Sequence, residues 1–424
     1  MKHTLPRRRQ RAARLTAGIA AGAVAALLLA GCSAGGSGDP ASAGHPADKN
    51  TSADLTYAVW DQNQVAAIKA NIAAFNKECP KITVNVDVSP WDAYWTKLQT
   101  EASSNTLPDL FWMNGPNFQL YAANGKIAPI TDQVKAGDID PKNYSAALDA
   151  MYRYKGVQYG VPKDFDTIAV WVNKALFQQA GVALPSADWT WADFQKTAAE
   201  ISSKLKDQGV YGASGNLGGG QATYYNTILQ AGGNVIGVQF WTDLIASGGS
   251  PTVSQLTDTP SDKWYTNGKL AMLFNGSWFR SELTGTAPEK DTVVLPLPKG
   301  EKQATVIHGL TNAVAAGSKN LAAARAFQTF LAGKAAQQQQ GDLGAVIPAF
   351  TGTQDAFVKS LPSADLQVFI DAVAYAQPLP TSKNTAAWNS AETSLLPAAF
   401  DGSKPVPSVL KDLAAKMNAA LAAE

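Results

Sequence analysis

The chain has 424 residues, of which 46% are hydrophobic and 16% charged, and it contains 11 tryptophans and two cysteines. Its formal net charge of +1 gives no basic excess of the kind that nucleic-acid-binding domains carry, so no nucleic-acid partner is expected. A chain of this length and composition can bury a sizeable core and usually divides into two domains.

The first 31 residues combine a basic start with a short apolar run. Six Lys and Arg residues and no acidic residue precede an uncharged stretch over 15–31, which is too short to span a bilayer comfortably. This pattern is typical of a secretory signal peptide. Because Leu29-Ala30-Gly31 stands directly before Cys32, the segment resembles bacterial lipoprotein signals, which are cleaved before a cysteine that carries lipid. A signal anchor that stays attached is the alternative.

The segment over 32–53 consists mainly of small and polar residues, so we predict a flexible tether there. Removal of the signal peptide takes away six of the 35 basic residues and leaves 29 against 34 acidic ones, a net charge of about −5. Cys79 is then the only cysteine besides Cys32, which excludes a framework of intrachain disulfides.

Folded sequence is expected from Asp54. A strand pattern over 55–60 is followed by apolar residues at helical spacing from Val65 to Phe75, and then by an alternating strand over 81–88 that ends before Pro90. The helix and strand steps recur over 95–113. Strand, helix and strand within about thirty residues indicate a βαβ unit, so the first lobe is predicted to be α/β.

Further helices are predicted over 190–206, 321–331 and 408–421. The first of them begins with Thr190 and has Asp193 three residues later, which is an N-terminal capping pattern. The run of four glutamines over 337–340 is expected at a helix end, without further significance.

Histidine, the commonest acid–base group of enzymes, is nearly absent. His45 lies in the predicted tether, so a Ser-His-Asp triad would have to use His308, and no GxSxG motif accompanies it. Cys and His are too few for a zinc cluster. Asp164 and Asp166 lie on one face if their segment is extended, which leaves a carboxylate pair of the glycoside-hydrolase type open as an alternative.

Several tryptophans stand beside turn-forming or short polar residues. This holds for Trp60, Trp112, Trp278 and Trp388. A sugar ring presents an apolar face of C–H groups and a rim of hydroxyls, and therefore suits flat aromatic surfaces with Asp, Asn or Arg at the edge. At least half of the tryptophans are expected in the core, including Trp171 and Trp241, but the turn-adjacent set favours a carbohydrate ligand.

Taken in order, these motifs resemble the extracellular solute-binding proteins of sugar ABC transporters, the maltose-binding-like group. The resemblance covers nearly the whole chain after the tether. It rests on the segments LTYAVWD, LPDLFWMN, YAANGKIAPITD, YKGVQYGVPKDFDTIAVWVNKALFQQAGV, TWADFQKTA, ILQAGGN, YTNGKLAMLFNGSW and PLPTSKNTAAWNSAETSLLPAAFDG.

The resemblance implies an α/β fold of the two-lobed, type II periplasmic-binding-protein kind, with three hinge crossings and a ligand cleft between the lobes. The first lobe would comprise 54–162 and 309–344, and the second 163–308 and 345–424. The crossings would lie near 160–163, 307–309 and 343–345. The family usually has a longer connection after AGGN, so we expect a tight connection over 233–238 here.

The resemblance also implies a set of residues that face the cleft and bind the ligand. These are Trp60, Asp61, Trp112, Asn114, Asp164, Asp166, Tyr224, Tyr225, Trp278, His308 and Trp388. No catalytic residue, metal ligand or cofactor is expected among them.

The function that the resemblance implies is capture of a mono- or oligosaccharide and its delivery to an importer. The partners would be permease subunits in the membrane with a separate ATPase, because the chain has no GxxxxGK[ST] motif of its own. The protein would act as a monomer at the extracellular face of the cytoplasmic membrane, anchored by lipid at Cys32. The alternatives are an extracellular glycan-binding module and a glycoside hydrolase.

Overall fold

The computed structural model describes residues 49–424. The signal peptide, Cys32 and most of the tether expected over 32–53 lie outside the described residues. The first strand begins at Ala53, one residue before the predicted start of folded sequence. Within the described part, no helix is long and apolar enough to cross a membrane.

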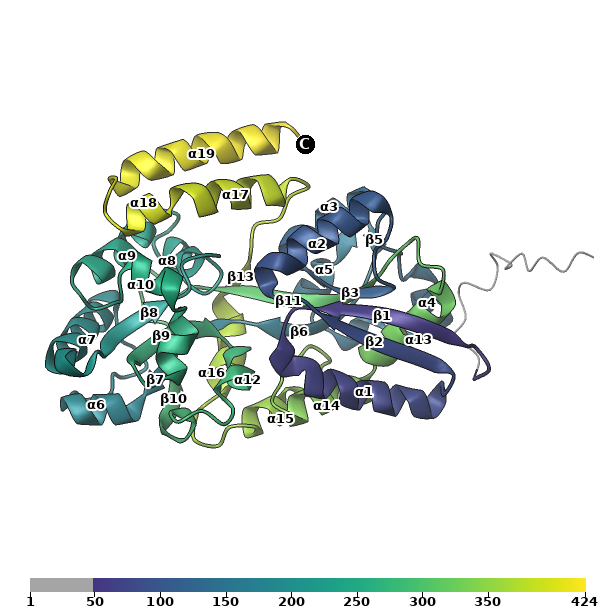
Figure 1. The fold of residues 1–424 in the computed structure, drawn as a ribbon, viewed down its shortest axis with the longest axis horizontal. Helices are drawn as coiled ribbons and strands as arrows, with labels where there is room; N and C mark the ends of the chain where they lie inside the picture. The colour runs from purple at the N-terminus through teal and green to yellow at the C-terminus, as the bar shows by residue number, and fades with distance from the viewer. Residues whose placement is uncertain (1–48) are drawn as a thin grey trace, which may run out of the picture. The chain divides into compact units, whose positions relative to one another are not determined.

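A seven-stranded sheet brings together strands from the first and the second half of the described chain (Figure 1). The strand order is β12-β6-β11-β3-β1-β2, with β13 paired to β11. Its strands are β1 (Ala53–Val59), β2 (Ile82–Val88), β3 (Leu110–Asn114), β6 (Pro162–Asp166), β11 (Thr305–Val314), β12 (Ile347–Pro348) and β13 (Ala376–Pro378). β1 pairs in parallel with both β2 and β3, which confirms the predicted βαβ unit.

A second, four-stranded sheet has the order β10-β7-β9-β8. Its strands are β7 (Ile168–Asn173), β8 (Tyr211–Gly215), β9 (Leu270–Gly276) and β10 (Thr292–Leu295). A short hairpin of β4 (Arg153–Tyr154) and β5 (Val157–Gln158) precedes β6. Both large sheets carry almost continuous apolar strands such as β7, because helices cover their faces (Figure 1).

The helices that accompany the seven-stranded sheet are α1 (Val65–Glu78), α2 (Trp91–Ser104), α3 (Gly115–Ala123), α4 (Thr131–Ala136), α5 (Ala146–Ala150), α13 (Leu321–Ala332) and α14 (Lys334–Asp342). The helices beside the four-stranded sheet are α6 (Lys174–Ala180), α7 (Trp191–Lys204), α8 (Tyr224–Gln230), α9 (Ile236–Ala246), α10 (Val253–Asp258), α11 (Ser261–Thr266), α12 (Phe279–Leu283) and α16 (Gln367–Asp371). α15 (Gln354–Lys359) packs against α14 and β12 instead. The chain ends with α17 (Thr385–Leu395), α18 (Pro397–Phe400) and α19 (Val406–Ala422), and α18 packs on α9.

The predicted helices are present with small shifts at their ends. α7 begins after Thr190, whose side chain forms the predicted capping box with Asp193. The connection between α8 and α9 is short, as expected, and Gly237 lies so close to the backbone of α8 that a Cβ there would come within 2.5 Å of Ile228. The glutamine run, in contrast, lies inside α14, and the Gln337 side chain bonds to the backbone of Pro162 and Phe350. The prediction that this run lies at a helix end and has no further significance is therefore wrong.

Three apolar cores hold the described chain together. One packs the inner strands of the seven-stranded sheet against their helices, and a second does the same for the four-stranded sheet and the C-terminal helices. The third contains residues of both sheets, for example Phe165 of β6, Trp171 of β7 and Ile347 of β12. The two sheets thus share buried apolar contacts as well as covalent connections.

The chain passes between the two sheets at Thr167, between β10 and β11, and after β12. The first passage lies later than the expected crossing over 160–163, because β6 is held in the seven-stranded sheet by pairing with β11 and β12. The lobe boundaries given above stay a prediction, since they concern which parts move together.

Candidate functional site: a cavity between the two sheets

A cavity of about 450 Å³ lies between the two sheets, a volume within the range of small-molecule sites. It is lined by Trp60, Asp61, Gln64, Pro90, Trp91, Asp164, Asp166, Asn216, Gly219, Gly220, Gln221, Ala222, Ser261, Asp262, Asn275, Trp278, Glu282, His308, Leu310 and Val346. Elements of both sheets therefore contribute to one site.

Trp60 and Trp91 form one side of the cavity, which we call the aromatic wall. Trp60 directly follows β1 and Trp91 begins α2 after β2, so both stand at the carboxyl end of a parallel strand, where α/β sheets usually bind ligands. The Trp60 ring makes edge contacts with Trp91, Tyr94 and Trp112, with centroids 5.0 to 5.1 Å apart. These contacts fix the orientation of the Trp60 ring before any ligand arrives.

Asp164 and Asp166 lie two residues apart on β6 and both line the cavity, so the prediction that they share one face is confirmed. Asp166 accepts a hydrogen bond of 2.7 Å from the Ser277 hydroxyl. His308 of β11 lies opposite Asp166 in the strand register, and its Nδ1 is 3.7 Å from Asp166 Oδ2. These side chains form a polar floor where the two sheets meet.

Asp164 is bound on both of its oxygens. Oδ2 accepts from Lys163 Nζ at 2.5 Å, and Oδ1 accepts from the Leu310 amide at 2.9 Å. Burial raises the pKa of the Asp164 carboxyl, an effect that the Lys163 ammonium opposes. The Lys163 ammonium also donates to Gln64 and lies 4.7 Å from the centre of the Trp112 ring. Asp164 therefore has a structural partner for each oxygen, which speaks against its use as a hydrolytic acid or nucleophile.

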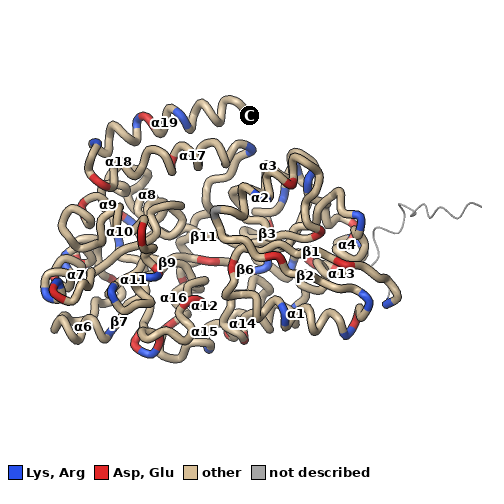
Figure 2. The backbone as a smooth tube through the Cα atoms, in the orientation of Figure 1, with Lys and Arg blue, Asp and Glu red and all other residues tan. Residues whose placement is uncertain are grey.

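Asp262 of α11 and Glu282 of α12 form the opposite side of the cavity, which we call the acidic wall, and Trp278 stands one helical turn before Glu282. Burial, followed by the neighbouring Asp262 and then Asp61, raises the pKa of Glu282 to about 8. Acidic residues are visible along β6 and beside α12 in Figure 2. The cavity is thus rich in carboxylates on both sides.

A glycine-rich loop, residues 218–220, closes the cavity next to α8. Gly220 has a φ of +69°, and a Cβ there would come within 2.4 Å of the Tyr224 ring. Gly219 has open space around it. Of these two positions, only 220 therefore requires a glycine, both for its backbone conformation and for its close packing.

Six of the eleven expected site residues line the cavity: Trp60, Asp61, Asp164, Asp166, Trp278 and His308. Their binding of a ligand stays a prediction. Trp112 does not line it, because it lies inside β3 rather than after it, and its fully buried indole donates to the Tyr57 hydroxyl at 2.7 Å. Asn114 is likewise buried, and its side-chain oxygen caps α3 by accepting from the Asn117 amide.

The three remaining residues point toward the C-terminal helices instead of the cavity. The hydroxyls of Tyr224 and Tyr225 donate to the Glu392 carboxylate of α17 at 3.3 and 2.5 Å. This carboxylate is buried, and burial raises its pKa to about 7. Trp388 of α17 is 4% exposed and donates to the Ser382 hydroxyl. These three residues are not among those that line the cavity, and their contact with a ligand stays a prediction.

Sequence reasoning missed several lining residues for which a signal existed. Trp91 follows Pro90, which was already recognised as a strand end, and Glu282 lies four residues after Trp278 on the same helix. Asp262 has no such signal, because only the packing of α11 against β9 brings it to the cavity.

Among the described residues, no group of three or more His, Cys, Asp and Glu side chains is arranged to hold a metal ion.

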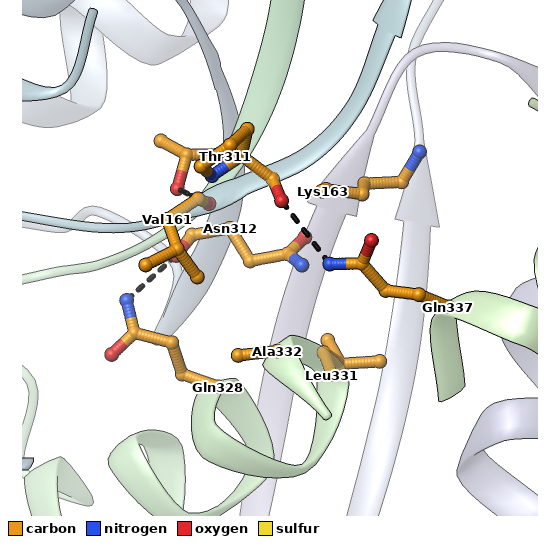
Figure 3. A pocket seen from close by; sticks show the side chains of 9 residues that line it. Val161, Lys163, Thr311, Asn312, Gln328, Leu331, Ala332 and Gln337 are labelled. Carbon is orange, nitrogen blue, oxygen red and sulfur yellow. Dashed lines mark hydrogen bonds between the residues drawn. The ribbon is translucent and has the colours of Figure 1, made fainter. Parts of the chain in front are cut away.

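A second, much smaller void lies behind the floor, between β6, β11 and the helices α13 and α14 (Figure 3). Its volume of about 10 Å³ leaves room for about one water molecule. Around it Gln328 donates to the Asn312 carbonyl, and Thr311 donates to the Val161 carbonyl. This void is part of the packing between the strands and cannot hold a sugar.

The two sheets with a cavity between them define a two-lobed α/β binding protein. A solved structure of an ABC substrate-binding protein from Listeria monocytogenes, in complex with cycloalternan, superimposes with a TM-score of 0.80 and 23% identity, covering 86% of this chain and 97% of that one. The predicted type II periplasmic-binding-protein fold is thereby confirmed.

The model of the family described as bacterial extracellular solute-binding protein matches residues 59–338, and the chain belongs to this family. A putative binding protein of Brucella abortus is 24% identical over 57% of this chain and 62% of the relative. The diacetylchitobiose binding protein DasA of Streptomyces coelicolor is 26% identical over 73% of this chain and 76% of the relative. The family comprises extracellular binding proteins, and this supports neither hydrolysis nor another enzymatic activity.

Proposed function

We propose that this protein is the substrate-binding component of an ABC sugar importer, and that it captures a mono- or oligosaccharide in the cavity between its two lobes. The observation that carries the proposal is the combination, in one cavity of about 450 Å³, of three indole rings with carboxylates at their edges. The rings suit the apolar faces of a sugar and the carboxylates accept from its hydroxyls. The cycloalternan complex and the diacetylchitobiose binding protein among the similar proteins support a carbohydrate ligand.

A ligand in this cavity contacts both lobes at once. It would stabilise the closed arrangement of the lobes in proportion to its preference for that arrangement over the open one. The closed, loaded form is what we propose the permease recognises, with a separate ATPase supplying the energy. The protein would work as a monomer.

The N-terminal segment supports attachment to the outer face of the cytoplasmic membrane. We propose cleavage before Cys32 and lipidation of that cysteine, with the residues over 32–53 as tether. Replacement Cys32→Ser should release the protein into the medium, whereas Cys79→Ser, which removes the buried cysteine of the folded part, should leave it in the membrane fraction. Equal fractionation of Cys32→Ser and the unaltered protein would contradict the lipid anchor.

The sugar-binding function is tested on the purified folded part. Intrinsic tryptophan fluorescence and calorimetry are recorded with a panel of neutral, amino and acidic mono- and oligosaccharides, and native mass spectrometry searches for a sugar that copurifies. We expect saturable binding of at least one saccharide with a fluorescence change from the cavity tryptophans. The absence of any fluorescence change and any heat across the panel would overturn the proposal.

A further inference from the structure

The carboxylates of the cavity come close together without a matching cation. Asp61 stands on the side of the aromatic wall, and Asp262 and Glu282 form the acidic wall. Both aspartates contribute to the raised pKa of Glu282, after burial, which shows that their charges are near enough to act on it. Glu282 is therefore mostly protonated near neutral pH, and Asp61 and Asp262 carry the negative charge of this part of the cavity.

No Lys or Arg is found among the residues that line this cavity in the described chain. Lys163 directs its ammonium to Asp164 and Gln64, away from the acidic wall. Lys263 Nζ is 3.5 Å from Asp262 Oδ2, but its side chain is 58% exposed, and such exposed pairs contribute little. The negative charge of Asp61 and of the Asp262–Glu282 pair is thus opposed mainly by the exposed Lys263.

His308 provides a second, independent observation. The residue is 4% exposed and lines the same cavity, yet neither ring nitrogen has a hydrogen-bond partner. The nearest carboxylate oxygen, Oδ2 of Asp166, is 3.7 Å from Nδ1, too far for a hydrogen bond. Buried polar side chains in folded proteins are normally satisfied, so an imidazole that has one donor and one acceptor nitrogen and no partner in a cavity points to a polar ligand.

We infer that the ligand of this cavity is a saccharide that carries at least one protonated amino group, placed between Asp61 and the acidic wall. This inference rests on the proposed sugar-binding function and names the chemical class of the sugar. The ammonium group supplies three donors and a positive charge, and the indole faces of Trp60, Trp91 and Trp278 attract cations as well as C–H groups. A neutral sugar offers hydroxyl donors but brings no positive charge to Asp61 and the Asp262–Glu282 pair, and an anionic sugar adds negative charge beside them.

The inference is tested with sugars that differ at one substituent. Glucosamine is compared with N-acetylglucosamine and glucose, the galactose and mannose counterparts are compared in the same way, and so are the β-1,4-linked dimers of the glucose series. In every series with measurable binding, we expect the free amine to bind at least about tenfold more tightly than its acetylated and hydroxyl counterparts, because one charge contact of this kind is worth that much.

A second measurement detects whether Glu282 of the acidic wall releases a proton when the sugar binds. Because the pKa of Glu282 lies near 8 without ligand, the group is mostly protonated at pH 7, and a neighbouring ammonium lowers that pKa. Calorimetry in two buffers of different ionisation enthalpy should therefore show proton release on binding of the amine and none for the neutral sugar.

The variant Glu282→Gln removes the charge and keeps the shape, and should weaken binding of the amine by about tenfold without weakening that of the neutral counterpart. Asp258→Asn, on the exposed part of α10, makes the same change in net charge away from the cavity and should alter neither. Equal or tighter binding of the neutral or acetylated sugars would overturn the inference and leave the sugar-binding function standing. Absence of binding by every sugar would overturn both.

Discussion

The two sides of the cavity are built by different forces. The aromatic wall rests on ring contacts, in which Trp60 touches Trp91, Tyr94 and Trp112, so folding alone fixes it. The acidic wall consists of Asp262 and of Glu282, whose pKa burial and the neighbouring Asp262 raise to about 8, and these residues stand on the short helices α11 and α12. The rings of the aromatic wall are therefore held in place before a ligand binds. The acidic wall, in contrast, receives a balancing positive charge only when the inferred ligand binds.

The support behind the aromatic wall can be removed without touching its surface. Trp112→Ala takes away a fully buried indole, its hydrogen bond to Tyr57 and the ring beneath Trp60. We expect the free energy of unfolding to fall by about 3–5 kcal/mol, as for other large core truncations. Urea unfolding followed by circular dichroism measures the change.

The matched control is Trp91→Ala, because this indole is 45% exposed and only half of its surface packs against the protein. It should cost about 1–2 kcal/mol in unfolding free energy, less than Trp112→Ala, because nearly half of the indole is already exposed. If both variants lose the same stability, the buried Trp112 does not support the aromatic wall more than Trp91 does. The statement that folding alone fixes the aromatic wall would then be wrong.

The positions of these tryptophans show how far the sequence alone reaches. Alternation and helical spacing predicted β1, α1, β2 and the capped α7, because these patterns follow from local geometry. Trp60 was assigned to the cleft on other grounds, namely its neighbour Asp61 and the family resemblance. Trp112 was misplaced because β3 continues for two residues beyond it, and one extra pair of strand residues decides whether a side chain ends in the core or in the cavity.

Contacts between distant elements were beyond such reasoning. The hydroxyls of Tyr224 and Tyr225 donate hydrogen bonds to Glu392, which lies some 170 residues later in the chain, and no local sequence pattern predicts that partner. The buried role of Gln337 likewise depends on the backbone of Pro162, on another element. The family resemblance supplied the fold and the general place of the cleft, but assigned residues to it by motif, without their side-chain partners.

The second prediction compares two tryptophans that sequence reasoning treated alike. Trp278 lines the cavity next to the acidic wall, and Trp388 is buried in α17 with its indole bound to Ser382. Trp278→Ala should weaken sugar binding by about 1–3 kcal/mol, the scale of a lost aromatic contact, and Trp388→Ala should leave the affinity of the folded protein unchanged while lowering its stability. Calorimetric titration and urea unfolding of both variants separate the two effects. Loss of affinity in Trp388→Ala alone would reverse the assignment.

The third prediction concerns the glycine loop, which lines the cavity next to α8. Gly220→Ala places a methyl group on a backbone with φ of +69° and within 2.4 Å of the Tyr224 ring, so the loop or the ring must move. We expect a loss of about 1–2 kcal/mol in unfolding free energy from the left-handed conformation alone. Thermal or urea unfolding provides the measurement.

Gly219→Ala is the internal control for this loop, because a Cβ there has nothing within 4 Å and its φ lies outside the left-handed region. Its effect on unfolding should stay within about 0.5 kcal/mol. The two glycines are neighbours, and both variants gain the same methyl group. A difference between their unfolding free energies therefore reports the backbone conformation of Gly220 and its contact with Tyr224. Equal stabilities would mean that neither the left-handed conformation of Gly220 nor its contact with Tyr224 restrains the loop, contrary to the prediction.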